Sequence, residues 1–260
     1  MAVKQVLNML DLLEFFAERG KAASLAEVSG ALNWPRSSTF NLLTTLTARG
    51  YLYEPEAKGR FYPTPRWLSM AQAITAAEPL PEQLLRLARD LAMRTGETLC
   101  LGSASGQKVV FLEVIPSPQR VRYAAEVGQQ VPLHATASGH AILSQWSQSQ
   151  REAFLRRTTF ERYGSGTPMS VEAVEGQMSA GLARGWFRSA SNYSVDLGGV
   201  ALPVAIAGRI YSVTVAGPLN RITGEMSAIA REMHDAVALH FGQDYLSREI
   251  RGLTTPPLPR

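Results

Sequence analysis

The chain has 260 residues, 45% of them hydrophobic and 18% charged, which fits a globular protein with a sizeable core and leaves room for two domains. Its net charge of +4 is compatible with a polyanionic partner but does not identify one. We expect no membrane partner and a reducing cytoplasm, because no apolar run approaches roughly 18 residues, no secretory signal is recognisable, and Cys100 is the single cysteine.

The first two segments in chain order are predicted to be helices. Over residues 3–19, apolar side chains recur at three- and four-residue steps, and Gly20 ends the pattern. Ser24 is predicted as the N-cap of a second helix, because Glu27, three residues later, completes a capping box. This second helix is short and is expected to stop near residues 30–33.

A third helix is predicted to begin near Pro35, with Phe40, Leu43 and Leu46 on its core side. Its N-terminal half is polar, and the first turns of the second helix of a helix-turn-helix are the part that contacts base edges. Arg and Asn suit guanine and adenine edges, whereas Ser and Thr suit phosphates. The candidate DNA-binding residues on this helix are Arg36, Ser37, Ser38, Thr39, Asn41 and Thr45. The alternative is a solvated cap of a three-helix bundle.

Two short aromatic runs, GYLYEP and GRFYPT, flank a turn that has Pro and Gly in breaker positions, which predicts a β-hairpin. Three helices followed by a hairpin indicate a winged helix-turn-helix domain over residues 1–64, with double-stranded DNA as its partner. Lys58 and Arg60 are expected to lie over the phosphate backbone. The alternative for both is a solvated turn that contacts nothing.

The rest of the chain is predicted to form a linker helix over residues 65–79, a second domain over 80–248 and a disordered tail over 249–260. Strands, then helices, then strands on one core indicate an α+β fold rather than a doubly wound parallel sheet. The expected elements are a helix over 81–95, a three-stranded meander that ends in QRVRYAAEV, helices over 138–146, 148–157 and 170–184, two strands joined at Ala207-Gly208, and a helix over 224–242.

Three motifs resemble the IclR family of bacterial transcription regulators over residues 3–245: STFNLLTTLTARGYL, GQQVPLHATASGHAILSQ, and GVALPV followed by VTVAGPLNRIT. The resemblance implies a winged helix-turn-helix joined by a linker helix to a GAF-like effector-binding domain. It also implies a homodimer or homotetramer on a palindromic operator, and control of catabolic genes by small organic acids or aromatics. Asn41 and His140 depart from the family, which usually has Arg and Lys there.

A pocket is predicted around the helix that starts near Ser138, because a helix N-terminus suits a carboxylate and Arg188 could bind one in two-point fashion. The candidate ligand-binding residues are Leu133, His134, Ala135, Thr136, Ala137, Ser138, Gly139, Arg188, Asn192, Tyr193 and Asp196. The expected effector is a small carboxylate or aromatic compound. The alternative is that Thr136 and Ser138 only cap the helix and that Arg188 is exposed to solvent.

Enzymatic patterns are not recognised in the sequence. The four histidines do not have metal-ligand spacing, no cysteine pair accompanies them, and neither a nucleophile elbow nor a glycine-rich phosphate loop is found. We therefore predict no metal, no cofactor and no catalytic residue. The alternative function is a small-molecule-binding enzyme or sensor domain with a helical N-terminal module. Candidate dimer surfaces, which could equally be core, carry Phe15, Trp67, Leu68 and Ile74.

Overall fold

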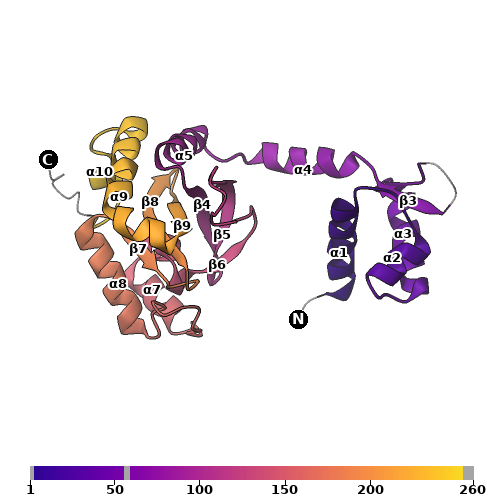
Figure 1. Ribbon diagram of the computed structural model, residues 1–260, viewed down its shortest axis with the longest axis horizontal. Helices are drawn as coiled ribbons and strands as arrows, with labels where there is room; N and C mark the ends of the chain where they lie inside the picture. Colours follow the sequence, from indigo (N-terminus) through magenta and orange to yellow (C-terminus); the bar gives the residue numbers. More distant parts are fainter. Residues whose placement is uncertain (1–2, 56–58, 254–260) are drawn as a thin grey trace. The chain divides into compact units, whose positions relative to one another are not determined.

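The computed structural model describes residues 3–55 and 59–253, and the chain divides into two compact units, Met1–Pro79 and Leu80–Arg260 (Figure 1). The first unit is a helical bundle with a small antiparallel sheet in the order β1-β3-β2. Its elements are α1 (Lys4–Arg19), β1 (Ala23–Ser24), α2 (Leu25–Ala31), α3 (Arg36–Ala48), β2 (Leu52–Tyr53), β3 (Arg60–Pro63) and α4 (Arg66–Ala77). This is the predicted winged helix-turn-helix followed by a further helix.

The capping box predicted for α2 is confirmed. The Ser24 hydroxyl accepts a hydrogen bond from the backbone N–H of Glu27 (3.3 Å), and the Glu27 carboxylate accepts one from the backbone N–H of Ser24 (2.8 Å). These bonds satisfy N–H groups that the first turn of a helix leaves unpaired. The start of α2 is therefore marked by local chemistry in the sequence.

The predicted core side of α3 is wrong by one residue. Thr39, Leu43 and Leu46 are buried, whereas Phe40 is 51% exposed. Spacings of four and three residues follow the 3.6-residue period of a helix, so this set stays on one side while a run of threes rotates away from it. Thr39 tolerates burial because its hydroxyl donates to the carbonyl oxygen of Pro35 (3.0 Å).

The second unit has α+β architecture and is built on a six-stranded antiparallel sheet in the order β6-β5-β4-β9-β8-β7. Its strands are β4 (Thr98–Ser105), β5 (Lys108–Ile115), β6 (Gln130–Pro132), β7 (Phe187–Ala190), β8 (Leu197–Ile206) and β9 (Arg209–Pro218). Its helices are α5 (Glu82–Thr95), the 3-10 turn η1 (Leu133–Ala135), α6 (Ala137–Leu143), α7 (Gln148–Leu155), α8 (Val171–Arg184), α9 (Leu219–Phe241) and α10 (Tyr245–Glu249).

Helices α6 and α9 lie on opposite faces of this sheet. A Cβ placed on Gly102 would meet the hydroxyl of Ser138, which is in α6, whereas a Cβ on Gly198 would meet Ile222 of α9. Side chains of a strand alternate between the two faces, so every residue of β4, β8 and β9 can be assigned to one side. The face that carries α6 is the one on which a pocket opens.

Three expectations for the second unit are wrong. Residues 119–127 form no strand; Thr98 donates to the carbonyl oxygen of Tyr123 (2.8 Å), and the short β6 takes the place beside β5. Helix α9 begins at Leu219, directly after Pro218, rather than near residue 224. The predicted disordered tail is contradicted over 249–253, because Ile250 and Leu253 are buried in the core, while 254–260 lie outside the described residues.

Within residues 3–55 and 59–253, no helix is both long enough and apolar enough to cross a membrane. The same part of the chain contains no cluster of three or more His, Cys, Asp or Glu side chains placed to hold a metal ion.

Candidate functional site

The polar tip of α3 forms an open surface on the first unit. Arg36, Ser37, Ser38 and Asn41 are exposed there, as is Thr45 one turn further along. Helix α3 contains no acidic residue, so nothing on the helix itself repels a phosphate. Leu43 and Leu46 anchor the opposite side in the core with Leu12, Phe16 and Val28 of α1 and α2. The helix is therefore held firmly while its first turns remain accessible.

Two of the residues on α3 that were predicted to contact DNA, Thr39 and Thr45, have their hydroxyls bonded to the backbone of the helix. Thr39 is only 1% exposed and its hydroxyl is bonded to the backbone, so it is a packing residue. Thr45 is exposed, but its hydroxyl donates to the carbonyl oxygen of Asn41 (2.6 Å). Such bonds to the preceding turn compete with any partner for the hydroxyl. Thr45 can contact DNA chiefly through its methyl group.

One of the two basic residues predicted for the wing, Arg60, also differs from expectation. The guanidinium of Arg60 donates to the carbonyl oxygen of Ala22 (2.7 Å) and lies 3.3 Å from the carboxylate of Glu27. These bonds tie β3 to the start of α2, which makes Arg60 a structural residue rather than a cation directed at a phosphate. Hydrogen bonds from Ser24 and the neighbouring Arg19 and Arg60 lower the pKa of Glu27 to about 2. Lys58 lies outside the described residues.

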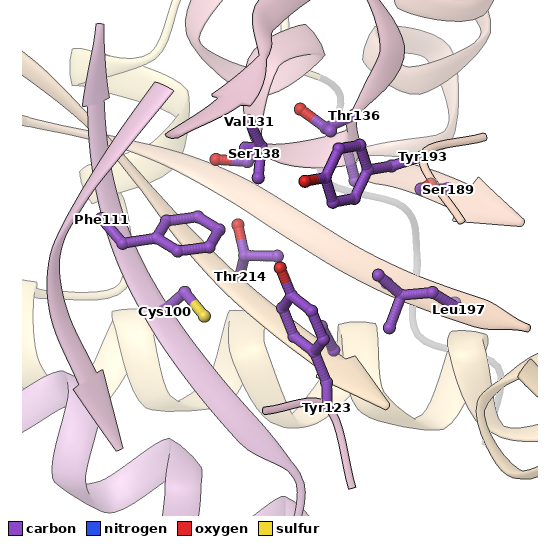
Figure 2. Close-up of a pocket in the computed structure, with 14 residues that line it drawn as sticks. Cys100, Phe111, Tyr123, Val131, Thr136, Ser138, Ser189, Tyr193, Leu197 and Thr214 are labelled. Atoms are coloured by element: carbon purple, nitrogen blue, oxygen red, sulfur yellow. The ribbon is translucent and has the colours of Figure 1, made fainter. Parts of the chain in front are cut away.

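The second unit contains a pocket on the α6 face of its sheet, with about 390 Å³ of atom-free space, part of it open to solvent (Figure 2). Its floor crosses β4, β9, β8 and β7, because the strand register places Cys100 opposite Thr214, Gly199 opposite Ala216, and Ser189 opposite Gly199. The full lining consists of Cys100, Phe111, Tyr123, Val131, Thr136, Ala137, Ser138, Ser189, Tyr193, Leu197, Gly198, Gly199, Thr214 and Ala216.

Aromatic rings form the walls of the pocket. Figure 2 shows Phe111, Tyr123 and Tyr193 around the side chain of Thr214, with Cys100 below. The hydroxyl of Thr214 is buried and has no hydrogen-bond partner among the described residues. A buried polar atom without a partner is costly, so this hydroxyl is the natural point for a ligand to form a hydrogen bond.

The hydroxyls of Thr136 and Ser138, which also line the pocket, are already paired. Thr136 accepts from the backbone N–H of Gly139 (3.0 Å) and donates to the carbonyl oxygen of Pro132 (3.0 Å), so it caps α6. The hydroxyls of Ser138 and Ser212 lie 2.5 Å apart and share one hydrogen bond. The alternative considered for Thr136, a cap on the helix, is therefore present in the structure.

The pocket environment disfavours negative charge. Burial raises the pKa of the Cys100 thiol to about 12, and burial together with Cys100 and Tyr193 raises that of the Tyr123 phenol. The lining contains no Lys, Arg or His side chain and no acid. A charged group bound at the floor would thus have no counter-ion from these residues.

Of the predicted ligand-binding residues, Thr136, Ala137, Ser138 and Tyr193 line the pocket. Leu133, His134, Ala135 and Gly139 serve the packing around it. Leu133 and Ala135 are buried core residues. The ring of His134 packs against the aromatic rings of Phe160 and Tyr163. Gly139 allows close packing rather than ligand approach, since a Cβ there would lie 2.0 Å from the carbonyl oxygen of Leu133.

The prediction that Arg188 binds the ligand is wrong. It pairs with Val200 across the sheet, whereas its neighbour Ser189 pairs with Gly199 at the pocket floor. Adjacent residues of a strand face opposite sides, so the exposed Arg188 faces away from the pocket. Asn192 is a turn residue: its side chain accepts from the N–H of Ala190 (3.1 Å) and donates to Gln177 (2.9 Å).

Asp196 is exposed and does not line the pocket; its backbone carbonyl oxygen accepts from the N–H of Leu219 (2.8 Å). The residues that the sequence reasoning missed come mainly from strands. Cys100 and Thr214 could have been found by combining the two-residue alternation of the runs TLCLGSAS and YSVTVAG with their pairing. Tyr123 could not, because its segment is irregular.

Of the four residues predicted to lie on dimer surfaces, two pack inside the first unit and two are exposed. Phe15 packs against the ring of Phe16 (5.3 Å between centroids), and the indole N–H of Trp67 donates to the carbonyl oxygen of Tyr51 (3.0 Å), so both are partly buried against the core of the first unit. Leu68 and Ile74 of α4 are exposed large apolar side chains.

A winged helix-turn-helix unit with an accessible polar helix tip, followed by an α+β unit with a pocket, defines a DNA-binding transcriptional regulator with an effector domain. Two family descriptions match the chain: the IclR helix-turn-helix domain over residues 5–56 and the bacterial transcriptional regulator IclR C-terminal domain over residues 72–240. The chain therefore belongs to the IclR family of bacterial transcriptional regulators and is not an enzyme.

Similar proteins agree with this assignment. The acetate operon repressor of Salmonella typhimurium is 25% identical over 248 residues, covering 92% of this chain and 90% of its own, and the transcriptional repressor IclR of Escherichia coli is 23% identical over the same coverage. The crystal structure of Thermotoga maritima IclR matches 92% of this chain and 98% of its own, with a TM-score of 0.74 at 17% identity.

A further structural match is an IclR homologue from Microbacterium hydrocarbonoxydans complexed with 4-hydroxybenzoate. It has a TM-score of 0.64 at 20% identity and covers 90% of this chain and 99% of its own. At such identities the two structures show that the fold is shared.

Proposed function

We propose that this regulator binds a palindromic operator through the tip of α3, and that a small aromatic effector in the pocket of the second unit modulates this binding. The observation that carries the proposal is the exposed tip of α3, in which Arg36, Ser37, Ser38 and Asn41 stand on a helix without acidic residues. Arg and Asn side chains have the donor geometry for guanine and adenine edges in the major groove.

The chemistry of the pocket supports an aromatic effector that is uncharged where it is buried. Three aromatic rings supply its walls, and the hydroxyl of Thr214 offers one hydrogen bond at the floor. The expected two-point contact of Arg188 with a carboxylate is removed, because Arg188 faces the other side of the sheet. A carboxylate on the effector would have to remain at the end of the pocket that opens to solvent. The regulated genes are proposed to serve the catabolism of this compound.

A homodimer is proposed as the binding species, since a palindromic operator presents two equivalent half-sites. Helix α1 supports this by carrying an exposed apolar stripe at positions i, i+3, i+4 and i+7, formed by Val3, Val6, Leu7 and Leu10. These residues lie on the side of α1 away from the buried Leu12 and Phe16.

Operator binding is tested by gel retardation of the promoter DNA that adjoins the gene for this protein. We expect specific retardation that weakens as salt is raised, because phosphate contacts release counterions. Arg36→Ala should lower the affinity about tenfold or more, the cost of losing a two-point base contact. Arg188→Ala, which removes an exposed arginine of the other unit, is the matched control and should have no effect. Equal retardation of unrelated DNA would contradict sequence-specific regulation.

Effector chemistry is tested by calorimetric titration at pH 7 with aromatic pairs that have nearly the same shape and differ in charge, such as 4-hydroxybenzamide and 4-hydroxybenzoate. The neutral member should bind at least as well as the anion and should alter retardation of the operator. Thr214→Val keeps the side-chain shape and removes the hydroxyl, and should weaken binding about fivefold. Binding of the anions alone, with Thr214→Val unaffected, would overturn the proposed pocket chemistry.

A further inference from the structure

Phe40 is an exposed aromatic residue on a helix whose other side packs into a hydrophobic core. Its side chain is 51% exposed, although Leu43 and Leu46 of the same helix are buried. An exposed large apolar side chain is unremarkable when it stands alone on an ordinary surface. Here it stands in the second turn of α3, within the part of the helix that a helix-turn-helix protein presents to base edges.

The neighbours of Phe40 on the helix surface are set by the helix period. Arg36 lies one turn before it and Thr44 one turn after it, while Asn41 follows it directly. Thr44 donates its hydroxyl to the carbonyl oxygen of Phe40 (2.8 Å), which leaves the methyl group as its apolar end. The ring of Phe40 and the methyl of Thr44 thus give this side of the helix an apolar edge beside the amide of Asn41.

The major groove contains one apolar feature that such an edge can recognise. Thymine presents its 5-methyl group there, and aromatic and methyl-bearing side chains contact it, whereas Asn forms paired hydrogen bonds with adenine. We propose that Phe40 is a specificity-determining residue that packs against a thymine methyl group, next to an adenine read by Asn41. The inference rests on the proposed DNA binding through α3 and adds which base, and which atom of that base, the helix prefers.

This assignment explains an exposed phenylalanine that the fold does not require. Contact with phosphates or with deoxyribose would be served by Ser37 and Ser38, which are hydrophilic and exposed on the same tip. A large apolar ring gains free energy only where it removes another apolar group from water. At the base edges of the major groove the thymine methyl is that group.

The test begins with an operator selected from random duplexes by the wild-type protein. Each thymine of the selected site is then replaced by uracil, which removes the methyl group and keeps every hydrogen-bonding atom. We expect one position in each half-site at which this replacement weakens binding of the wild type about fourfold, the value of one buried methyl group. Phe40→Ala should bind the thymine and uracil duplexes at that position equally.

Two controls separate this role from others. Asn41→Ala should weaken binding to both duplexes yet keep the preference for thymine over uracil. Phe40→Leu retains an apolar contact, so it should keep part of the preference, and circular dichroism should show both Phe40 variants folded, because the side chain is outside the core.

The outcomes distinguish the inference from the function on which it rests. A wild type that selects no sequence would overturn the proposed operator binding. A selected operator that is insensitive to every thymine-to-uracil change would overturn the role of Phe40 alone. A thymine preference that persists in Phe40→Ala would assign the methyl contact to another residue. Loss of dimerisation in Phe40→Ala, with no change in thymine preference, would make the ring a protein contact and also overturn the proposal.

Discussion

His140 lies inside α6 with its ring Nε2 2.7 Å from the carbonyl oxygen of His134. Because a carbonyl oxygen only accepts, this nitrogen carries a proton and donates it. Burial, partly opposed by this bond, lowers the pKa of His140 to about 4. The histidine that occupies this position is therefore held as a neutral hydrogen-bond donor that joins α6 to the preceding turn η1.

The depressed pKa of His140 predicts a loss of stability in mild acid. The unfolded chain binds a proton near pH 6.5, whereas the folded chain resists it down to about pH 4. The stabilisation is thus complete above pH 6.5 and falls as the pH drops toward 4, by up to about 3 kcal/mol. Urea unfolding at pH 7 and pH 4.5 measures it.

His140→Gln is the control for this prediction, since it keeps a donor and cannot titrate. It should lose less stability than the wild type between the two pH values. A remaining loss is expected from His134, whose pKa is also lowered, mainly by burial. Equal acid sensitivity in wild type and His140→Gln would mean that His140 is not the responsible group.

At the scale of elements, the junction of η1 and α6 depends on one glycine. A Cβ at position 139 would lie 2.0 Å from the carbonyl oxygen of Leu133, a backbone atom that cannot rotate away. Gly139→Ala should therefore lower the unfolding free energy by about 3 kcal/mol, as overpacking of a dense core does. Thermal unfolding measures the change. Gly176→Ala, in α8 where a Cβ would meet nothing within 4 Å, should leave stability unchanged or slightly raised.

The elements that the sequence predicts well are those whose ends are marked by local chemistry. The capping box at Ser24 and the turn at Ala207-Gly208 depend on residues within four positions of each other, and the structure has both. The segment 119–127 alternates like a strand, but its backbone carbonyl groups at Val121 and Tyr123 accept from the side chains of Arg221 and Thr98. Such long-range partners are invisible in a local pattern.

The site is harder to predict than the fold for the same reason. The rotational phase of α3 determines whether Thr39 or Phe40 faces outward. The predicted phase was off by one residue, which exchanged the buried and the exposed position. The phase of β7 likewise decided that Ser189, and not Arg188, reaches the pocket. Composition names the right segment in both cases, but only the pairing of that segment with its neighbours fixes which side chain is presented.

At the scale of the whole molecule, the exposed apolar stripe on α1 predicts a dimer. Two charged substitutions within this stripe should disrupt it. Leu7→Glu with Leu10→Glu places carboxylates on an exposed apolar face without touching the buried Leu12 and Phe16. We expect sedimentation to show a monomer and retardation of the palindromic operator to be lost, with the helical content unchanged. Leu239→Glu, at a leucine of α9 that is more exposed than Leu7 and Leu10, should remain dimeric. A double variant that still sediments as a dimer would place the interface elsewhere.

The two units separate the two recognition tasks along the chain. The accessible helix tip belongs to Met1–Pro79, and the pocket belongs to Leu80–Arg260. The sequence indicates this division, since the helix-turn-helix pattern lies in the first unit and the small-residue PLHATASG segment lies in the second. Within each unit, the phase of a helix or the register of a strand determines which side chains face a base or a ligand.

The position of Cys100 has a practical consequence for finding the effector. The chain has one thiol, and that thiol forms part of the pocket floor. Because burial raises the pKa of this thiol to about 12, it alkylates slowly, and labelling has to run for hours at alkaline pH. A small reagent reaches the sulfur through the space that a bound compound would fill, so the mass of the intact protein after such labelling reports how many copies were empty. Extracts of cells grown on different carbon sources can then be ranked by the protection they confer, before any compound in them has been purified.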